Sequence, residues 1–463
     1  MARRILLIAF VAMLSACSDA GDTASLSNRV YVQAGGSSSG NGSHELPFST
    51  LAEAQAASSP GDQILLMPSA VILDGNIVLQ PDQQLIGLAA EGGELVRVTH
   101  TAGSQSEPVV ALSERNEITG LHFVDLRGPA ILGQNVDFSG ADVHHNRFTG
   151  AVESDAPIWA CRLSSTVNIS NVRVSDNLIR DGLALGGIQV IQQGTSTGAY
   201  RFERNEFYDI GNRAYHLWTQ DDSSLNAEIV DSKADNIGRG DKNSDSILTH
   251  LSGSSEQTVL VKNYRYRNSG QVGNASNTGL EAFIQGAPFT GEERWCDGCR
   301  LNLRIIDSQF DGAVADGIQL TNFGSNSVFD VEIRGTTVSG AKPRQVGGGI
   351  SLVVQNEVNT GNHANLLIEN SEVIDSTGYG FAVRALGEGH SATIDLGGGE
   401  LGSSGNNRIV GSVRGEIQAT NASLVAKHNW WGGEPPRIDL QGDGSVVHAD
   451  PALPVDPAGG QAP

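Results

Sequence analysis

The amino-acid sequence predicts an all-β protein, a single right-handed parallel β-helix solenoid with a short N-terminal capping helix. The 463 residues include 57 glycines but only 5% aromatic residues, a composition typical of short strands joined by tight turns. A unit of strand, Asn or Asp, glycine turn, small residue and second strand recurs along the chain. Its glycines lie 29, 27, 32, 42, 28 and 38 residues apart from Gly182 to Gly378, which suits coils that each carry one variable loop. Helical periodicity is almost absent after residue 60.

The first residues are expected to direct export. Two arginines precede an apolar stretch over residues 5–14, which is too short to span a bilayer. The following string, Leu14-Ser15-Ala16-Cys17, resembles the lipobox of bacterial lipoproteins. The resemblance implies a signal peptide over residues 1–16 and lipidation of Cys17. The alternative is an ordinary signal peptide followed by a stray cysteine.

The same resemblance implies an address. Ser18 rather than Asp follows the cysteine, which favours sorting to the outer membrane of a Gram-negative bacterium. The membrane would then be a partner through the N-terminal lipid, with residues 17–27 as a tether. The expected location is the cell envelope.

The β-helix domain is expected over residues 28–450. It begins with a strand at residues 30–32 and the one clear helix, over residues 48–57, with Ser49 or Thr50 as N-cap and Glu53 in the first turn. Such a helix would protect the open end of the first coil, where apolar core and strand edges would otherwise meet solvent. The Pro/Gly/Ala-rich residues 451–463 are expected to be a disordered tail.

Strand alternation divides the side chains of each coil between core and surface. After the small residue that opens each strand, the first and third positions point inward, as for Ile188, Leu217, Ile318 and Ile350. The second positions point outward and form one column: Gln189, His216, Leu248, Glu281, Gln319, Ser351 and Ala382. The fourth positions form another: Ile191, Trp218, His250, Phe283, Thr321, Val353 and Arg384. The sixth positions add Gln193, Gln220, Ser252, Gln285 and Gln355.

This strip of outward side chains is the candidate site. Aromatic rings suit the C–H faces of sugars, while amides and arginine suit hydroxyls and carboxylates. The candidate substrate-binding residues are Trp218, Phe283, Gln189, Gln319 and Gln285, and the candidate catalytic residues are His216, His250, Glu281 and Arg384. The alternative is a surface in which Gln and Thr ladders only stabilise the solenoid.

If the protein is an enzyme, polysaccharide lyase chemistry suits the strip better than glycoside hydrolysis. A lyase needs a base, for which His216 or His250 is available, and a group such as Arg384 that neutralises the uronate. Hydrolysis needs two facing carboxylates, and Asp245 is expected to be only a distant partner for Glu281.

The net charge of the chain and the positions of its acidic residues limit which molecules and ions it is expected to bind. The net charge of −22 would repel phosphate backbones, so no nucleic acid is expected. No cofactor is certain. Ca²⁺ is one option, through Asp221, Asp222, Asp241 and Asp245, and solvated loop acids are the other. The oligomeric state stays open.

The cysteines beyond residue 17 are expected to serve structure. In an oxidising compartment a Cys296–Cys299 disulfide fits, with Cys161 left over. A thioredoxin-type redox motif would need a helix after the Cys-x-x-Cys string, and zinc would need four suitably spaced ligands. Neither condition is met, so no metal site is assigned.

Both ends of the domain resemble a known family. The run Tyr31-Val-Gln … Asn41-Gly … Pro47-Phe48 … Leu51 … Ala54 … Ala57 … Pro60-Gly61-Asp62 resembles the beginning of pectin-lyase-like right-handed β-helix proteins. The run Asp395-Leu-Gly-Gly-Gly399 … Asn406-Asn407 … Asn429-Trp430-Trp431-Gly432 resembles how many of them finish. The resemblance covers residues 28–450 and implies the fold.

The same resemblance leaves the activity open, because this fold carries lyases, hydrolases, epimerases and adhesins alike. The Arg-x-Pro-x-x-Arg string of pectate lyases has its nearest match at residues 127–132, without the final arginine. Asp-Pro-His of alginate epimerases is absent, and of the polygalacturonase motifs only Asp221-Asp222 occurs. The expectation is a surface or periplasm-facing lipoprotein that binds, and as an enzyme would cleave, an extended acidic polysaccharide. The alternative is a non-catalytic adhesin or envelope scaffold.

Overall fold

The structure is a computed structural model that describes residues 28–152, 154, 156–239, 244–268, 277–286, 295–343, 347–355 and 360–459. The expected signal peptide, the tether and Cys17 lie outside this part of the chain, as does Asp241. Among the described residues there is no helix whose length and apolar character would let it cross a bilayer.

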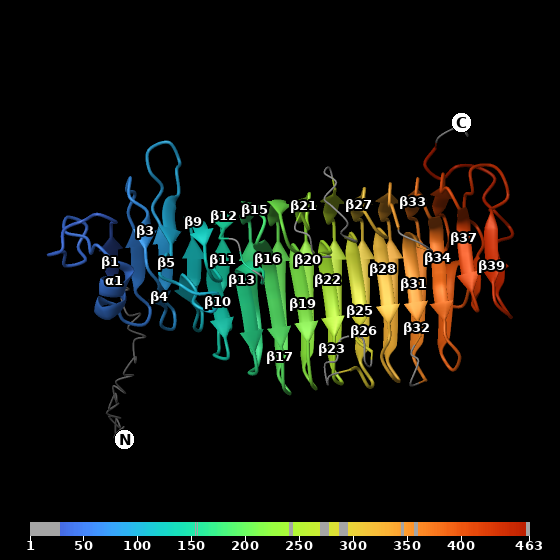
Figure 1. Cartoon of the computed structure of the whole chain (residues 1–463), viewed down its shortest axis with the longest axis horizontal. Helices are drawn as coiled ribbons and strands as arrows, with labels where there is room; N and C mark the ends of the chain where they lie inside the picture. Colours follow the sequence, from blue (N-terminus) through green and yellow to red (C-terminus); the bar gives the residue numbers. More distant parts are fainter. Residues whose placement is uncertain are drawn as a thin grey trace, which may run out of the picture.

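The chain is a right-handed parallel β-helix solenoid, as its sequence predicts (Figure 1). Every named strand pair is parallel and joins successive coils, so the coils stack along the long axis with the two termini at opposite ends. Apolar residues alternate with polar ones along the strands, since only one face of each strand meets the core. The three sheets contain 15, 13 and 12 strands.

The 15-stranded sheet contains β1 (Arg29–Val32), β2 (Gln63–Leu66), β5 (Gln84–Gly87), β8 (Glu117–Thr119), β11 (Asp142–His144), β14 (Ile169–Ser175), β17 (Thr197–Glu203), β20 (Ser224–Val230), β23 (Glu256–Lys262), β26 (Arg300–Ile306), β29 (Val328–Arg334), β32 (His363–Glu369), β35 (Ser391–Gly397), β38 (Ser423–Ala426) and β40 (Val446–His448). The 13-stranded sheet, which faces the viewer in Figure 1, contains β4 (Ile77–Val78), β7 (Val110–Ala111), β10 (Ile131–Gln134), β13 (Ile158–Ser165), β16 (Leu185–Gln192), β19 (Tyr215–Thr219), β22 (Ile247–Leu251), β25 (Leu280–Ile284), β28 (Ile318–Asn322), β31 (Gly348–Val354), β34 (Tyr379–Leu386), β37 (Gly415–Thr420) and β39 (Ile438–Gln441). The 12-stranded sheet contains β3 (Leu73–Asp74), β6 (Val96–Thr99), β9 (Leu121–Leu126), β12 (Arg147–Ala151), β15 (Leu178–Gly182), β18 (Glu206–Ile210), β21 (Lys233–Asp235), β24 (Arg265–Arg267), β27 (Gln309–Asp311), β30 (Thr337–Ser339), β33 (Glu372–Ile374) and β36 (Arg408–Val410).

The inward positions form one continuous core along the axis. The four residues predicted to point inward, Ile188, Leu217, Ile318 and Ile350, are all 0% exposed. The predicted register of the 13-stranded sheet is therefore confirmed for the core positions. It also fixes the opposite, outward face, where the candidate site lies.

Asparagines at one corner of the solenoid link neighbouring coils. Nδ2 of Asn177 donates to Oδ1 of Asn205 at 3.0 Å, and Nδ2 of Asn146 donates to Oδ1 of Asn177 at 3.2 Å. The residue before each asparagine has positive φ, 58° for Asp176 and 50° for Arg204, and the asparagine side chain turns inward to bond.

The N-terminal cap is helix α1 (Leu51–Ala57), three residues shorter at its start than the pattern predicted. Thr50 is the N-cap, and with Glu53 it forms a capping box in which each side chain bonds the other's backbone. Buried Leu51 and Ala54 join the core of the first coil. Residues 451–459, expected to be disordered, contact the solenoid: Arg408 pairs with the buried Asp456 at 3.2 Å.

Candidate functional site

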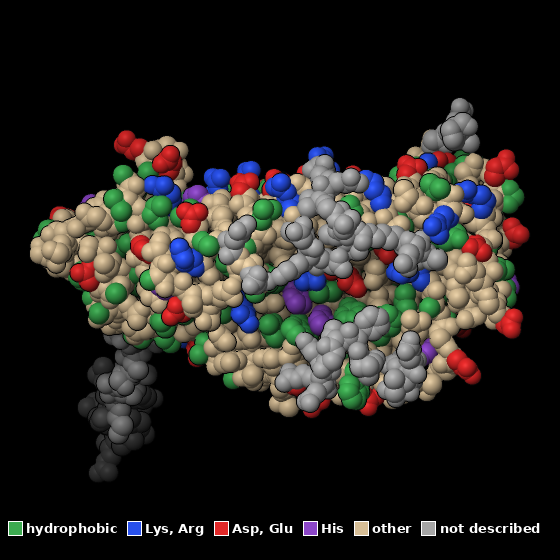
Figure 2. Space-filling model, in the orientation of Figure 1, with side chains coloured by type: hydrophobic (Ala, Val, Ile, Leu, Met, Phe, Trp, Pro, Cys, Tyr) green, Lys and Arg blue, Asp and Glu red, His purple; other side chains and the backbone are tan. Residues whose placement is uncertain are grey.

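The predicted outward strip lies on neighbouring strands of the 13-stranded sheet. Register pairs join its second positions in the order Gln189, His216, Leu248, Glu281 and Gln319. Other pairs join its fourth positions in the order Ile191, Trp218, His250, Phe283 and Thr321. The predicted adjacency of these residues therefore holds, and Figure 2 shows histidines among hydrophobic side chains near the middle of this face.

Aromatic rings stack across the coils of the strip. The rings of Trp218 and His250 lie parallel, with centroids 4.7 Å apart, and those of His250 and Phe283 lie 5.3 Å apart. His216 stacks on His250 at 6.2 Å and contacts the buried Trp159 at 6.0 Å. Trp218, His250 and Phe283 remain partly exposed, so they offer a half-open apolar surface of the kind on which sugar rings stack.

Hydrogen bonds with two glutamines determine which ring nitrogen of each histidine carries the proton. Oε1 of Gln285 can only accept, so Nε2 of His250 donates to it at 2.9 Å and Nδ1 keeps its lone pair. Nε2 of Gln189 donates to Nδ1 of His216 at 3.1 Å, so the proton of His216 is on Nε2. Burial lowers the pKa of His250 to about 4 and that of His216 well below 6.5. Both imidazoles are therefore neutral at pH 7.

Glu281 and Asp245 form a close carboxyl pair. Burial, the charge of Asp245 and a hydrogen bond between the two side chains raise the pKa of Glu281 well above its ordinary value. Asp245 is 3% exposed, and its Oδ1 accepts from Oγ1 of Thr278 at 2.7 Å. The expectation that Asp245 is distant from Glu281 was wrong. Asp245 lies at the corner before β22. Its side chain reaches the next coil, where Glu281 lies on β25.

A third carboxylate and two arginines complete the charged part of the site. The pKa of buried Asp316 is raised, mainly by burial, and its charge also raises the pKa of Glu281. Nη1 of Arg384 lies 3.5 Å from Oδ2 of Asp316, and Nε of Arg213 lies 3.7 Å from Oδ2 of Asp245. The charge of Arg213 also lowers the pKa of both histidines, so it lies close to the whole group.

The place of Arg384 in the strip differs from the prediction. The register shifts between Leu352 and Val353, and Val353 pairs with Ala385 instead of Arg384. A β-bulge therefore inserts one residue into β34. The alternation of polar and apolar residues in the sequence gives no sign of this insertion. Arg384 still reaches the site, because its side chain extends back to Asp316 two coils earlier.

Arg162 extends the strip in the N-terminal direction and was missed by the sequence pattern. It pairs in register with Gln189, so it lies in the same outward column. Its Nε is buried without a hydrogen-bond partner, and none of the described carboxylates lies within 4 Å of its guanidinium. The recurrent glycines of the sequence begin at Gly182, one coil after Arg162, so the pattern one coil earlier would have revealed this residue.

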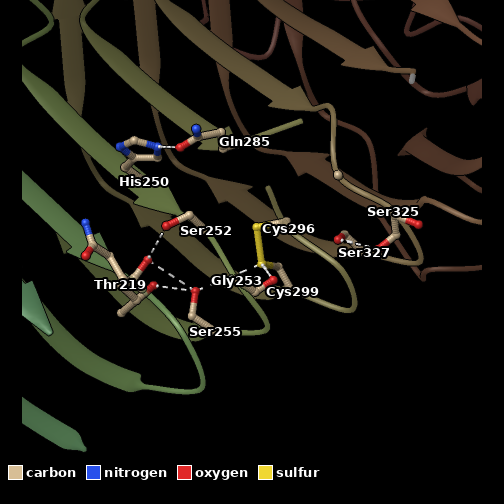
Figure 3. Close-up of a disulfide and its surroundings, with 12 residues drawn as sticks. Thr219, His250, Ser252, Gly253, Ser255, Gln285, Cys296, Cys299, Ser325 and Ser327 are labelled. Atoms are coloured by element: carbon tan, nitrogen blue, oxygen red, sulfur yellow. Dashed lines mark hydrogen bonds between the residues drawn. A yellow bond between two sulfur atoms is a disulfide. The ribbon is translucent and has the colours of Figure 1, made fainter. Parts of the chain in front are cut away.

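The remaining polar contacts hold the candidate residues in place. Gln319 donates to Glu281 at 3.1 Å, and Nε1 of Trp218 donates to Ser252 at 3.3 Å. Cys296 and Cys299 are joined by a disulfide with Cα atoms 5.5 Å apart (Figure 3). The backbone N–H of Cys296 donates to the carbonyl of Gln285 at 2.9 Å, so the disulfide loop is tied to the residue that bonds His250.

Two further sequence features lie apart from this chemistry. Cys161 is buried in the core as a free thiol, and burial raises its pKa to about 12. In the described part of the chain, no group of three or more His, Cys, Asp or Glu side chains has the arrangement of a metal site. Ca²⁺ binding at Asp221 and Asp222 stays a prediction, since Asp241 lies outside that part.

Comparison with known proteins gives one family match. Residues 250–438 match the model of a family described as protein of unknown function (DUF1565). No curated protein sequence matches the chain.

Three solved structures of other proteins are similar to this chain. The A-module of mannuronan C-5 epimerase AlgE6 from Azotobacter vinelandii is 11% identical, over 88% of this chain and 94% of that one, with a TM-score of 0.45. A rhamnogalacturonan lyase is 12% identical over 92% and 87%, with a TM-score of 0.31. The catalytic domain of a GH87 alpha-1,3-glucanase in complex with nigerose is 12% identical over 91% and 68%, with a TM-score of 0.39. At such identities the likeness concerns the fold alone, the parallel β-helix.

Proposed function

We propose that the protein binds an extended acidic polysaccharide along the 13-stranded sheet and cleaves it by β-elimination. The observation that carries the proposal is the juxtaposition, on one face, of neutral His250 and of Glu281, whose pKa is raised by burial and by Asp245, with Arg213 close to both. A neutral imidazole is a base, a carboxyl of raised pKa is an acid, and a guanidinium binds carboxylate.

The shape of the strip suits a polymer. From Arg162 on β13 to Gln319 on β28 it crosses six neighbouring strands, or about 24 Å at the usual strand spacing. Trp218 and Phe283 would stack on sugar faces near the middle. Arg162, free of carboxylate partners in the described residues, would bind a uronate carboxylate several units from the reacting one.

In the reaction, Nδ1 of His250 would take the proton from the carbon next to the uronate carboxyl. The electron pair of that C–H bond forms a C=C bond, and the bond from the neighbouring carbon to the glycosidic oxygen breaks. Glu281 gives its proton to the departing oxygen. Arg213 binds the carboxylate on which negative charge accumulates. It is better placed than Arg384, because its charge acts on His216, His250 and Glu281, whereas Arg384 pairs with Asp316.

The carboxyl geometry favours elimination over hydrolysis. Glycosidases hold their two carboxyl groups about 5–10 Å apart, so that a nucleophile or a water fits between them and the sugar. Glu281 and Asp245 are within hydrogen-bond distance of each other, which leaves no room for a nucleophile or a water between them. In this proposal Asp245 keeps Glu281 protonated.

The decisive experiment incubates the purified mature chain with a panel of polyuronides and follows the ultraviolet absorbance of unsaturated product. We expect product from at least one polyuronide with the wild-type protein. H250A and E281Q should lose about 100-fold or more in kcat, the usual contribution of a general acid or base. E228Q, on β20 of another sheet, is the matched control and should keep full activity.

Two outcomes would reject elimination. Binding without product, in all of these variants alike, would favour the non-catalytic adhesin or scaffold. Loss of activity in E228Q as large as in E281Q would show a general rather than a local effect. The proposed location, a lipid anchor at Cys17 in the cell envelope, rests on the lipobox-like string alone.

A further inference from the structure

A concave site lies on a different sheet from the strip, near the N-terminal end of the solenoid. A cavity of about 1110 Å³ is bordered by the outward face of β6, β9 and β12 and by the segments that follow β2 and β5. Three basic side chains line it: Arg97, His122 and Arg147. They are consecutive register partners on the 12-stranded sheet, so they stand side by side at the usual strand spacing of about 4.8 Å.

The two arginines of this cavity differ from the arginines that form ion pairs on the same sheet. In the described part of the chain, three arginines in the strands of that sheet form ion pairs: Arg180 with Asp181 at 2.6 Å, Arg267 with Asp235 at 3.5 Å and Arg408 with Asp456 at 3.2 Å. Among the described residues, neither Arg97 nor Arg147 lies within 4 Å of a carboxylate. Glu94 also borders the cavity but is exposed and pairs with neither. Two guanidinium groups without a carboxylate partner in one cavity form a candidate site for an external anion.

The donors point to the kind of ligand. Nε of Arg147 is buried and has no hydrogen-bond acceptor, a state that costs free energy unless a ligand supplies one. Nη2 of Arg97 donates to the carbonyl of Ala70 at 2.9 Å, which holds this side chain at the rim and leaves its other N–H groups available. Nε2 of His122 is hydrogen-bonded to Oγ1 of Thr149 at 2.7 Å, which fixes the ring between the two arginines.

We propose that this cavity binds a sulfate or phosphate group, either as the free anion or as an ester on a sugar. Arg97 and Arg147 project from strands about 10 Å apart, on either side of His122. Both guanidinium groups can therefore converge on one tetrahedral oxyanion above the imidazole, and each offers paired N–H donors. The volume leaves room for a sugar unit beside the anion.

The test measures binding of inorganic sulfate, inorganic phosphate and a monosaccharide sulfate to the full mature chain by isothermal titration calorimetry. We expect saturable binding of at least one of these probes. R147Q and R97Q should weaken it about tenfold or more, the effect of one lost charge-assisted contact. R180Q is the matched control: it removes the same charge one coil away, from an arginine that has a partner, and should leave binding within about twofold.

The source of the group follows from the same titrations. Tighter binding of the sugar sulfate than of inorganic sulfate supports an ester, and equal binding supports the free anion. Absence of saturable binding for all probes would overturn the proposal, as would equal weakening in R180Q. Since Arg97 is exposed, R97Q tests the site even if R147Q fails to fold. None of these outcomes depends on polysaccharide cleavage at the other sheet.

Discussion

Trp218 and His250, on neighbouring strands, stack with their ring planes 4° apart and their centroids 4.7 Å apart. The stack holds the imidazole beside a partly exposed indole face, so a sugar that packs on Trp218 would lie next to His250. The two residues would link substrate binding to the proposed base. Substituting each of them separately tests the two roles.

Trp218→Ala should weaken binding of an acidic polysaccharide by about 1–3 kcal/mol, because it removes the aromatic face on which the sugar packs. Isothermal titration with a polyuronide measures the change. Trp295→Ala removes a more exposed tryptophan, 45% accessible, from a nearby loop and should leave affinity unchanged. Equal losses in both variants, or none in Trp218→Ala, would contradict the proposed contact.

His216 and His250 should make stability fall in mild acid, because the pKa of each is lowered in the folded chain. The pKa of His250 is lowered to about 4 in the folded chain, chiefly by burial, and is near 6.5 in the unfolded chain. Between these values the unfolded state binds more protons, so the free energy of unfolding decreases as pH falls from about 6.5 towards 4. Above pH 6.5 this loss is absent.

His250→Gln should reduce that pH dependence, because glutamine does not titrate. Urea unfolding at pH 7, 6, 5 and 4 gives the slopes for both proteins. His448→Gln, at an exposed position, is the control and should keep the wild-type slope. An unchanged slope in His250→Gln would show that this imidazole is not held neutral by burial.

Ile318→Ala should destabilise the fold by about 2–5 kcal/mol, since the side chain is fully buried between β25 and β31 and its loss leaves a cavity. Val413→Ala, at a position 69% exposed, should change stability by less than about 0.5 kcal/mol. Reversible thermal or urea melts measure both. A similar small change for Ile318→Ala would place the residue outside the core.

Expression of the full chain in a Gram-negative host should give a mature protein that starts at Cys17 and carries lipid. Intact-mass measurement of the membrane fraction detects both the cleavage and the added mass. Cys17→Ser should abolish the modification and release the protein to the soluble fraction. A soluble wild-type protein that starts at another residue would reject the lipid anchor.

The fold and the strip were predictable because strand alternation and the small residue at each strand start fix which side chains point outward. The register that aligns His216 with Glu281 through Leu248 follows from that rule alone. The positions of Asp245 and Asp316 did not follow from this rule, because both residues precede their strands. They lie at corners, where side chains do not alternate between two faces. Where such side chains turn depends on the shape of the corner.

Arg213 and Arg384 show two other limits. Arg213 lies in the turn before β19, so its position depends on the path of that turn. Arg384 is the extra residue of a β-bulge, a feature of pairing between strands that leaves no mark in the strand's own alternation. The disulfide between Cys296 and Cys299, by contrast, was predictable from their sequence separation of three and the expected oxidising compartment.

The asparagine chain through Asn146, Asn177 and Asn205 has a consequence for how such a protein can change in length. Each amide donates to the next coil, so a cut within a coil would leave a buried donor without an acceptor. Lengthening or shortening in units of one complete coil preserves every link. Insertions in the segments between strands leave the links untouched. The solenoid can therefore lengthen or shorten only by complete coils. The loops that border the site are free to diverge in length and sequence.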